Sequence, residues 1–137
     1  MPQPVSLAFL GCGAATRTHS KVLAPFGSEV QRFYASRSLP SAEAYNREYK
    51  GAGAFGSYAD AMADPRVQAV VVATPPDSHL ELTRAALEAG KHVVLEKPAF
   101  LRAADFDLVR PLEARSGRRL MVAENYATSR SRARCAR

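Results

Sequence analysis

Short apolar segments alternate along this chain with segments of helical periodicity, and this alternation restricts the possible folds more than any other feature. The strand patterns lie at 5–10, 29–36, 68–74, 92–98 and 119–126, with a very short one at Phe55. The helical patterns lie at 15–26, 41–49, 57–62, 80–89 and 103–115. Strands that alternate with helices through right-handed crossovers form a doubly wound parallel sheet. We therefore expect an α/β fold in three layers, with about six strands.

Capping residues mark several helix boundaries in this pattern. Ser57 is placed to cap one helix, and Asp77 or Ser78 to cap the next. Gly90 and Gly117 follow the last periodic residues of two helices, where a left-handed residue commonly ends a helix.

The first helix has an apolar stripe, which we expect to face the core. It consists of Ala15, His19, Val22, Leu23 and Phe26. His19 is therefore predicted to be a buried core histidine. His92 begins a strand, so we place it at the edge of the sheet opposite to the chemistry.

Length and composition indicate one globular, soluble domain. The chain has 137 residues, of which 47% are hydrophobic and 23% charged. No apolar run approaches the roughly 18 to 20 residues that cross a bilayer, and no signal peptide is evident. We expect a cytoplasmic protein with no membrane partner.

The basic charge is concentrated at the end of the chain. The formal net charge is +6, and four positive charges come from the arginines among residues 130–137. The remainder is nearly neutral and shows no basic stretch interleaved with aromatic residues, so we expect no nucleic-acid partner. Cys12 and Cys135 lack metal-ligand spacing, and we predict neither a metal site nor a disulfide framework.

A glycine-rich turn, GCGAAT at 11–16, follows the first predicted strand and opens the first helix. Gly11 and Gly13 permit a tight turn and close approach of a pyrophosphate, whose charge the N–H groups of the helix N-terminus meet. Thr16 replaces the third glycine of this motif, which weakens the match. Taken alone, the turn fits a methyltransferase or a purely structural turn almost as well.

The end of the second strand distinguishes between two dinucleotides. Proteins specific for NAD usually place Asp or Glu there for the ribose 2′-OH, but this chain has Ser36 and Arg37. Arg37 can pair with a 2′-phosphate and the Ser36 hydroxyl can donate to it. NADP is therefore favoured, with NAD still possible.

Thr74, Pro75 and Pro76 end the fourth strand and lead into the next helix. Prolines remove N–H donors and stiffen the loop, so this segment offers a rigid apolar ledge for a ring or a ribose. Proline near a helix start is also ordinary capping. His79 is placed to hydrogen-bond near the cofactor.

These segments together resemble a known family. GCGAATRTH, ASR, VVVATPPDSHLELTRAALEAGKHVVLEKP and VAENY occur in the same order as in the NAD(P)-binding Rossmann domain of the Gfo/Idh/MocA oxidoreductases. The resemblance covers residues 5–126 and is most specific over 69–98. It implies an enzyme that transfers a hydride to or from a sugar, a polyol or a related carbonyl or hydroxyl substrate.

The resemblance assigns the Glu96-Lys97-Pro98 segment to the reaction. It implies Lys97 as the catalytic residue beside the nicotinamide, and a cis Lys97-Pro98 peptide bond. A lysine at the end of a strand can stabilise the alkoxide that develops as hydride leaves, and Glu96 can orient it. The predicted cofactor contacts are Gly11, Gly13, Ala14, Ala15, Ser36, Arg37, Thr74, Pro75, Pro76, His79, Glu96, Lys97 and Asn125.

The resemblance also implies a second domain, which binds substrate and forms the oligomer interface in family members. We assign 1–126 to the dinucleotide-binding domain, expect the chain by itself to be inactive, and expect a homo-oligomer only in full-length relatives. Residues 127–137 form an Arg-rich tail without apolar periodicity, which we expect to be disordered and to arise from a shifted reading frame. The alternative function is a dinucleotide-binding module without turnover, or the remnant of a gene.

Overall fold

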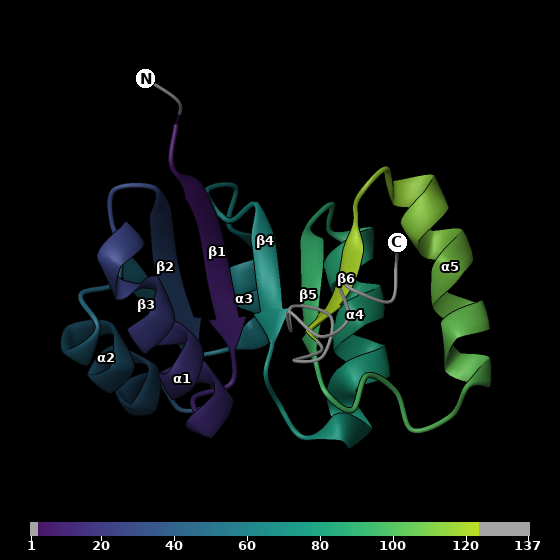
Figure 1. The fold of residues 1–137 in the computed structure, drawn as a ribbon, viewed down its shortest axis with the longest axis horizontal. Coiled ribbons are helices and arrows are strands. Elements are labelled where there is room, and N and C mark those ends of the chain that lie inside the picture. Colours follow the sequence, from purple (N-terminus) through teal and green to yellow (C-terminus); the bar gives the residue numbers. More distant parts are fainter. Residues whose placement is uncertain (1–2, 124–137) are drawn as a thin grey trace, which may run out of the picture.

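The apolar segments form one parallel sheet with the strand order β3-β2-β1-β4-β5-β6, as seen in Figure 1. The computed structural model describes residues 3–123 of the chain. The strands are β1 (Val5–Leu10), β2 (Val30–Ala35), β3 (Gly53–Phe55), β4 (Ala69–Val72), β5 (His92–Glu96) and β6 (Leu120–Ala123). The α-helices are α1 (Ala14–Leu23), α2 (Leu39–Glu48), α3 (Tyr58–Ala63), α4 (His79–Glu88) and α5 (Ala104–Ser116). Two 3₁₀ turns, η1 (Ala24–Phe26) and η2 (Pro76–Ser78), adjoin α1 and α4.

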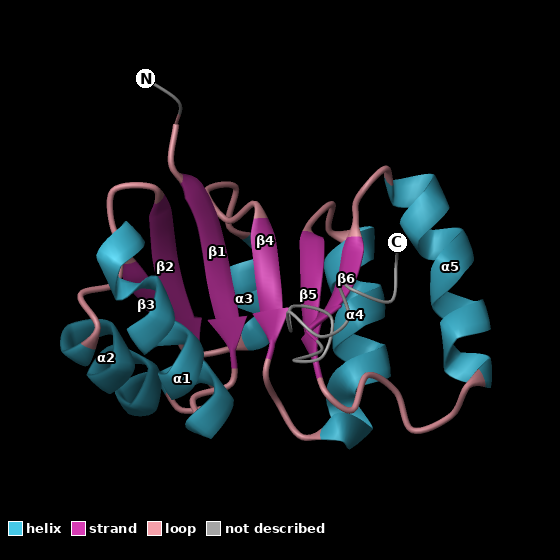
Figure 2. Ribbon diagram, in the orientation of Figure 1, coloured by secondary structure: helices cyan, strands magenta, loops and turns pink. Residues whose placement is uncertain are grey.

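Helices cover the sheet from both sides, as Figure 2 shows. The crossovers α1 and α2 lie on one face, α3 and α4 lie on the opposite face, and α5 packs against α4 beside the β6 edge. This arrangement confirms the predicted doubly wound α/β fold with three layers. Among the described residues, no helix is long and apolar enough to span a membrane.

Alternating side chains of the strands fill two cores on opposite faces of the sheet. The larger core lies under α3, α4 and α5 and includes Leu10, Phe33, Val70, Val72, Val93, Leu95, Leu82, Leu87 and Val109. The smaller core lies under α1 and α2 and is built on Phe9, Tyr34, Ala42 and Val71. Because successive strand residues face opposite sides, the continuous apolar runs serve both cores.

The prediction for the buried face of α1 is correct only in part, because Leu23 of the stripe packs against the smaller core. Val22 is 62% exposed and Phe26 in η1 is 48% exposed, whereas Thr16 and Ser20 are the fully buried side chains of this helix. Ser20 is within hydrogen-bonding distance of the Tyr34 hydroxyl, with the two oxygens 2.8 Å apart. Small polar side chains therefore share the α1–sheet contact with Leu23, and the tertiary contact of Ser20 is not indicated by the apolar periodicity.

The predicted cap of α4 is also wrong. No side chain caps this helix, which begins at His79 after η2. The Ser78 hydroxyl lies 2.6 Å from Thr74 Oγ1 and 2.8 Å from the Pro75 carbonyl, so it stabilises the preceding loop instead. The cap of α3 is confirmed, because Ser57 Oγ accepts a hydrogen bond from the Asp60 N–H at 3.1 Å.

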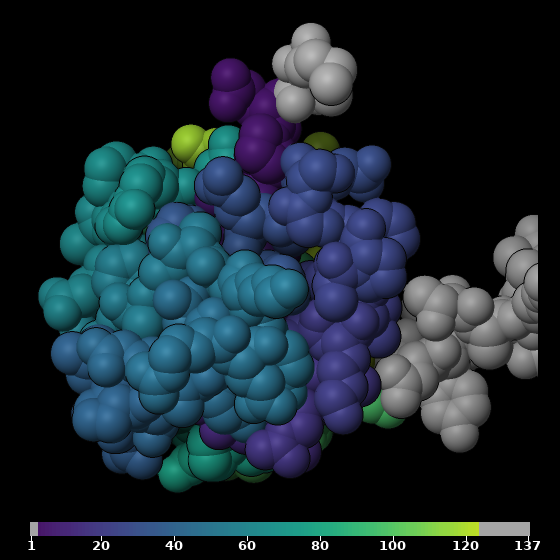
Figure 3. Space-filling view, turned by 90° about the vertical axis from the view of Figure 1, so that its left-hand side faces the viewer, coloured from purple at the N-terminus to yellow at the C-terminus, as the bar shows by residue number. Residues whose placement is uncertain are grey.

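The side of the molecule beyond β2 is closed by α2 and the β3 region. Figure 3 shows their blue surface covering this side, with the purple surface of α1 next to it. At the opposite end of the sheet, β6 is described as far as Ala123. The predicted extension of this strand to Tyr126, the proposed contact Asn125 and the tail 127–137 lie outside the described residues.

Candidate functional site

The loops that carry the predicted site residues meet at one edge of the sheet. All six strands are parallel, so the loops that follow β1, β2, β4 and β5 leave from the same, carboxyl edge (Figure 2). The chain adds β2 and β3 on one side of β1, and β4, β5 and β6 on the other. Ligands of doubly wound sheets bind at the point where the strand order reverses, which here is the boundary between β1 and β4.

The two glycines of the turn after β1 have different roles. Gly11 has φ +106°, and a Cβ there would lie 2.8 Å from the carbonyl oxygen of Ala73. Gly13 precedes α1 with φ −121°, and a Cβ there would meet no atom of residues 3–123 within 4 Å beyond its chain neighbours. Gly11 is therefore required by the fold itself, whereas Gly13 borders open space in the described part of the chain.

The N-terminus of α1 could accept a negatively charged ligand. No side chain caps it, and its first turn contains no acidic residue. Its first N–H groups, at Ala14 and Ala15, have no carbonyl partner within the helix. Thr16 replaces the third glycine without disturbing the turn, because its hydroxyl donates to the Gly11 carbonyl at 2.6 Å. The turn therefore has the architecture of a phosphate cradle despite the altered motif.

A tyrosine of α2 braces this turn from outside. The Tyr45 hydroxyl donates to the Gly13 carbonyl at 3.2 Å, and the Arg17 guanidinium lies 6.0 Å from the centre of the Tyr45 ring. The Cys12 thiol lies inside the turn, and burial raises its pKa.

The loop after β2 presents hydroxyl groups and a cation. Ser36 Oγ accepts a hydrogen bond from the Ser38 N–H at 3.1 Å, and the Ser41 hydroxyl lies 3.3 Å from that of Ser38. Arg37 is exposed, and the first turn of α2 contains no acidic residue. The structure thus places Ser36 and Arg37 at the carboxyl edge, beside a second helix N-terminus.

The loops after β4 and β5 are joined by His79. Its ring nitrogens lie 2.7 Å from the Thr74 carbonyl oxygen and 2.9 Å from the Ala99 carbonyl oxygen. The side chain is 0% exposed. This burial does not fit the expectation that His79 contacts the cofactor directly, and its observed contacts instead fix the ledge formed by Thr74, Pro75 and Pro76.

The Glu96-Lys97-Pro98 segment leaves the carboxyl end of β5. The Lys97-Pro98 peptide bond is cis, as the resemblance implied. Val93 and Leu95 belong to the core under α4, so the alternation of the strand directs Glu96 toward the face of α1. There Glu96 Oε1 pairs with His19 Nε2.

The pairing of His19 with Glu96 was missed in the sequence. His19 was expected to be a core histidine, but its side chain is 35% exposed and bonds to Glu96, which is 77 residues away in the chain. On this helix the stripe position did not separate core from surface residues, and it does not show which strand end lies opposite. Only the adjacency of α1 to the end of β5 could identify this pair.

No metal site accompanies these residues, since no cluster of three or more metal-ligating side chains occurs between residues 3 and 123. A cavity of about 470 Å³ lies at the amino edge and is lined by residues such as Val5, Pro65 and Lys91. None of the predicted cofactor contacts lines it.

The glycine cradle and the cis Glu-Lys-Pro turn agree with a comparison with known families. The Gfo/Idh/MocA model, described as an oxidoreductase family with an NAD-binding Rossmann fold, matches residues 5–124. The chain belongs to this family.

Oxidoreductases with named activities are among its relatives. A dTDP-3,4-didehydro-2,6-dideoxy-alpha-D-glucose 3-reductase of Saccharopolyspora spinosa is 32% identical over 92% of this chain and 37% of that protein. D-xylose 1-dehydrogenase (NADP(+)) of Hypocrea jecorina is 40% identical over 56% of this chain and 20% of that protein. The chain thus spans well under half the length of these curated relatives.

Solved structures support the fold. An NAD-binding protein from Listeria innocua has a TM-score of 0.80 at 34% identity, over 90% of this chain and 35% of that one. A 3-ketoreductase from Actinomadura kijaniata, in complex with NADP and TDP-benzene, has a TM-score of 0.88 at 22% identity. It covers 97% of this chain and 41% of that one.

Proposed function

We propose that this chain binds NADP in preference to NAD along the carboxyl edge of its sheet. In this proposal it supplies the dinucleotide-binding part of an oxidoreductase that acts on a sugar, a polyol or a related carbonyl or hydroxyl substrate. The observation that carries the proposal is the open space at Gly13, where the N-terminus of α1 has no side-chain cap and no acidic neighbour. A pyrophosphate fits such a position by charge and by shape.

In this proposal the loops divide the dinucleotide between them. The N–H groups of Ala14 and Ala15 bind the pyrophosphate, and Ser36 and Arg37 bind the 2′-phosphate. A ribose rests on the loop of Thr74, Pro75 and Pro76. The buried His79 holds this loop in place through the Thr74 carbonyl oxygen. Asn125 remains a proposed contact on the basis of the family resemblance.

Lys97 is the proposed catalytic residue. When bound, the nicotinamide accepts or donates the hydride. The Lys97 ammonium hydrogen-bonds the substrate oxygen and stabilises the negative charge that develops there. Glu96 lies one residue before it and accepts a hydrogen bond from the Lys97 N–H at 3.3 Å, so it orients the segment without contacting the substrate.

Substitution of Gly13 by Ala tests the cradle. The added methyl group meets no protein atom, so the free energy of unfolding should change by less than about 1 kcal/mol. It would occupy space close to the pyrophosphate, and we expect NADPH affinity to fall at least about tenfold. Gly27→Ala is the matched control, because a Cβ there meets only the Ala24 carbonyl, at an ordinary 3.6 Å. Unchanged NADPH binding by Gly13→Ala, measured by nucleotide fluorescence, would contradict the proposal.

The preference for NADP is tested separately with Arg37→Ala. A charge-assisted contact to the 2′-phosphate contributes about 1.5 to 3 kcal/mol, so NADPH affinity should fall by roughly tenfold or more while NADH affinity stays the same. Arg110→Ala, an exposed arginine on α5, serves as the control. Relatives named for NADP(+), such as the D-xylose 1-dehydrogenase, support this preference. Equal dissociation constants for NADPH and NADH in the unmodified chain would refute it.

A further inference from the structure

His19 connects two parts of the site that lie far apart in the sequence. It is the sixth residue of α1, the helix whose N-terminus forms the phosphate cradle. Its ring stacks on Phe9 of β1 with a centroid distance of 6.3 Å and an interplanar angle of 23°. The stacking fixes the plane of the imidazole, and Nε2 pairs with Glu96 Oε1 at the end of β5.

Glu96 is engaged through both of its oxygens. Oε1 pairs with His19, and Oε2 accepts the backbone N–H of Lys97 at 3.3 Å. The carboxylate is therefore held between α1 and the first residue beyond β5. The Glu96 side chain is only 21% exposed, so water competes weakly for these contacts.

We propose that His19 is a positioning residue, which holds the Lys97 segment in register with the phosphate cradle through Glu96. This inference rests on the proposed function, because the two ends it joins are the pyrophosphate end and the nicotinamide end of one dinucleotide. A continuous series of contacts runs from the cradle along α1 to His19, then to Glu96 and to the Lys97 backbone. Loss of the His19–Glu96 pair leaves the cradle intact, but the Lys97 segment at the nicotinamide end of the site is no longer held to α1.

Two substitutions at His19 separate positioning from simple packing. His19→Phe keeps a ring on Phe9 but removes the hydrogen-bonding nitrogen, whereas His19→Gln keeps a donor that can reach Glu96. The two ligands to compare are NADPH and 2′-phospho-ADP-ribose, which is NADP without its nicotinamide ring. Dissociation constants of the full chain for both ligands are measured by calorimetry.

We expect His19→Phe to weaken NADPH binding about tenfold, as loss of one charge-assisted contact does, and to change 2′-phospho-ADP-ribose binding less than about twofold. His19→Gln should restore most of the NADPH affinity. Equal weakening of both ligands, or no change in either, would overturn the inference, since the pair would then only fasten α1 or have no effect on the site.

A second variant keeps the inference testable if His19→Phe does not fold. Glu96→Gln preserves the shape of the side chain but removes its negative charge, and it too should weaken NADPH selectively. Unchanged NADPH affinity in Glu96→Gln would overturn the inference. If the unmodified chain binds neither ligand, both the proposed function and this inference fail, which distinguishes that outcome from a failure of the His19 role alone.

Discussion

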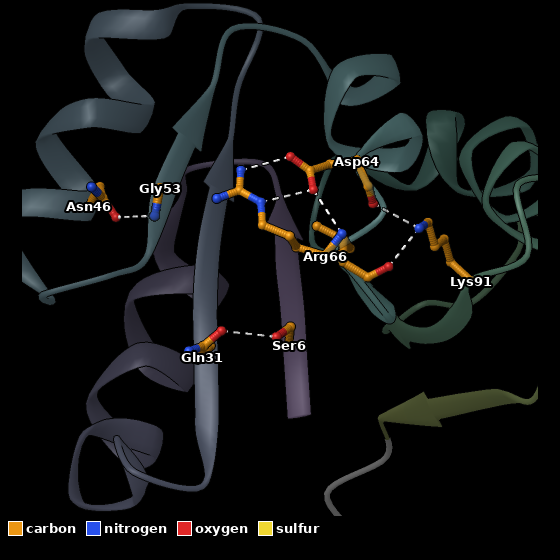
Figure 4. A network of polar contacts seen from close by, with 8 residues as sticks. Ser6, Gln31, Asn46, Gly53, Asp64, Arg66 and Lys91 are labelled. Atoms are coloured by element: carbon orange, nitrogen blue, oxygen red, sulfur yellow. Dashed lines mark hydrogen bonds and ion pairs between the residues drawn. The ribbon is translucent and has the colours of Figure 1, made fainter. Parts of the chain in front are cut away.

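Three charged side chains at the amino edge of the sheet, those of Asp64, Arg66 and Lys91, bond to the protein, whereas the carboxyl edge presents several groups to the surface. Lys91, which is only 8% exposed, donates to the carbonyl oxygens of Asp64 at 2.9 Å and Val67 at 2.6 Å. Arg66 forms a two-point pair with the Asp64 carboxylate at 3.0 and 2.8 Å. Figure 4 shows these contacts in one network.

The carboxyl edge is arranged differently. Arg37 and Pro75 are exposed there, and Gly13 borders open space. Polar groups that already have partners stabilise the fold, while exposed groups at the ends of parallel strands are available to a ligand. The comparison indicates that substitutions at the amino edge should change stability, and that most substitutions at the carboxyl edge should change binding.

Gly11→Ala should have the largest effect and marks the exception at the carboxyl edge. The residue has φ +106° and its Cβ would approach the Ala73 carbonyl oxygen to 2.8 Å, so strain and a backbone clash combine. We expect a loss of about 3 kcal/mol in the free energy of unfolding, measured by urea denaturation. A loss below about 1 kcal/mol would show that the turn relaxes easily. Gly27→Ala again provides the control.

Lys91→Met should have the next largest effect and tests the amino edge directly. The substitution keeps the apolar stem but removes the donor that two carbonyl oxygens share, and within residues 3–123 only that of Asp64 still accepts another hydrogen bond, from the Val67 N–H at 3.2 Å. We expect a cost of about 2 kcal/mol in unfolding free energy. NADPH affinity should not change, because the network lies at the opposite edge from the proposed site. Lys50→Met, at an exposed lysine, is the matched control. Reduced NADPH affinity in a folded Lys91→Met chain would contradict the assignment of the amino edge to stability and not to binding.

Asp64→Asn should have the smallest effect, which we expect to see in how the free energy of unfolding changes at acidic pH. Hydrogen bonds from Arg66 lower the pKa of Asp64 to about 2 from its usual 3.8. The carboxylate therefore contributes stability that is fully present above pH 3.8 and is lost as the pH falls through about 2. The substitution should lower the stability at neutral pH and flatten its decline between pH 4 and pH 2, as followed by circular dichroism. An identical acid-unfolding curve would show that the pair contributes nothing.

Local patterns in the sequence determined the architecture. Apolar runs, the Ser57 cap and the glycines that end α4 and α5 predicted an alternating α/β chain, and the structure confirms it. The glycine turn after β1 and the cis Lys97-Pro98 turn were also anticipated, the second through the family resemblance. These features depend on backbone conformation within a few residues, so a single stretch of sequence contains the necessary information.

The tertiary structure alone decided which side chains meet. The burial of Thr16 and Ser20 beneath α1 depends on how closely that helix approaches the sheet. The burial of His79 against Ala99, and the pairing of His19 with Glu96, depend on the parallel register that brings the ends of separate strands to one edge. A periodic pattern records which face of an element is apolar, but it does not record the partner of that face. The residues that position the site therefore became visible only once the sheet was assembled.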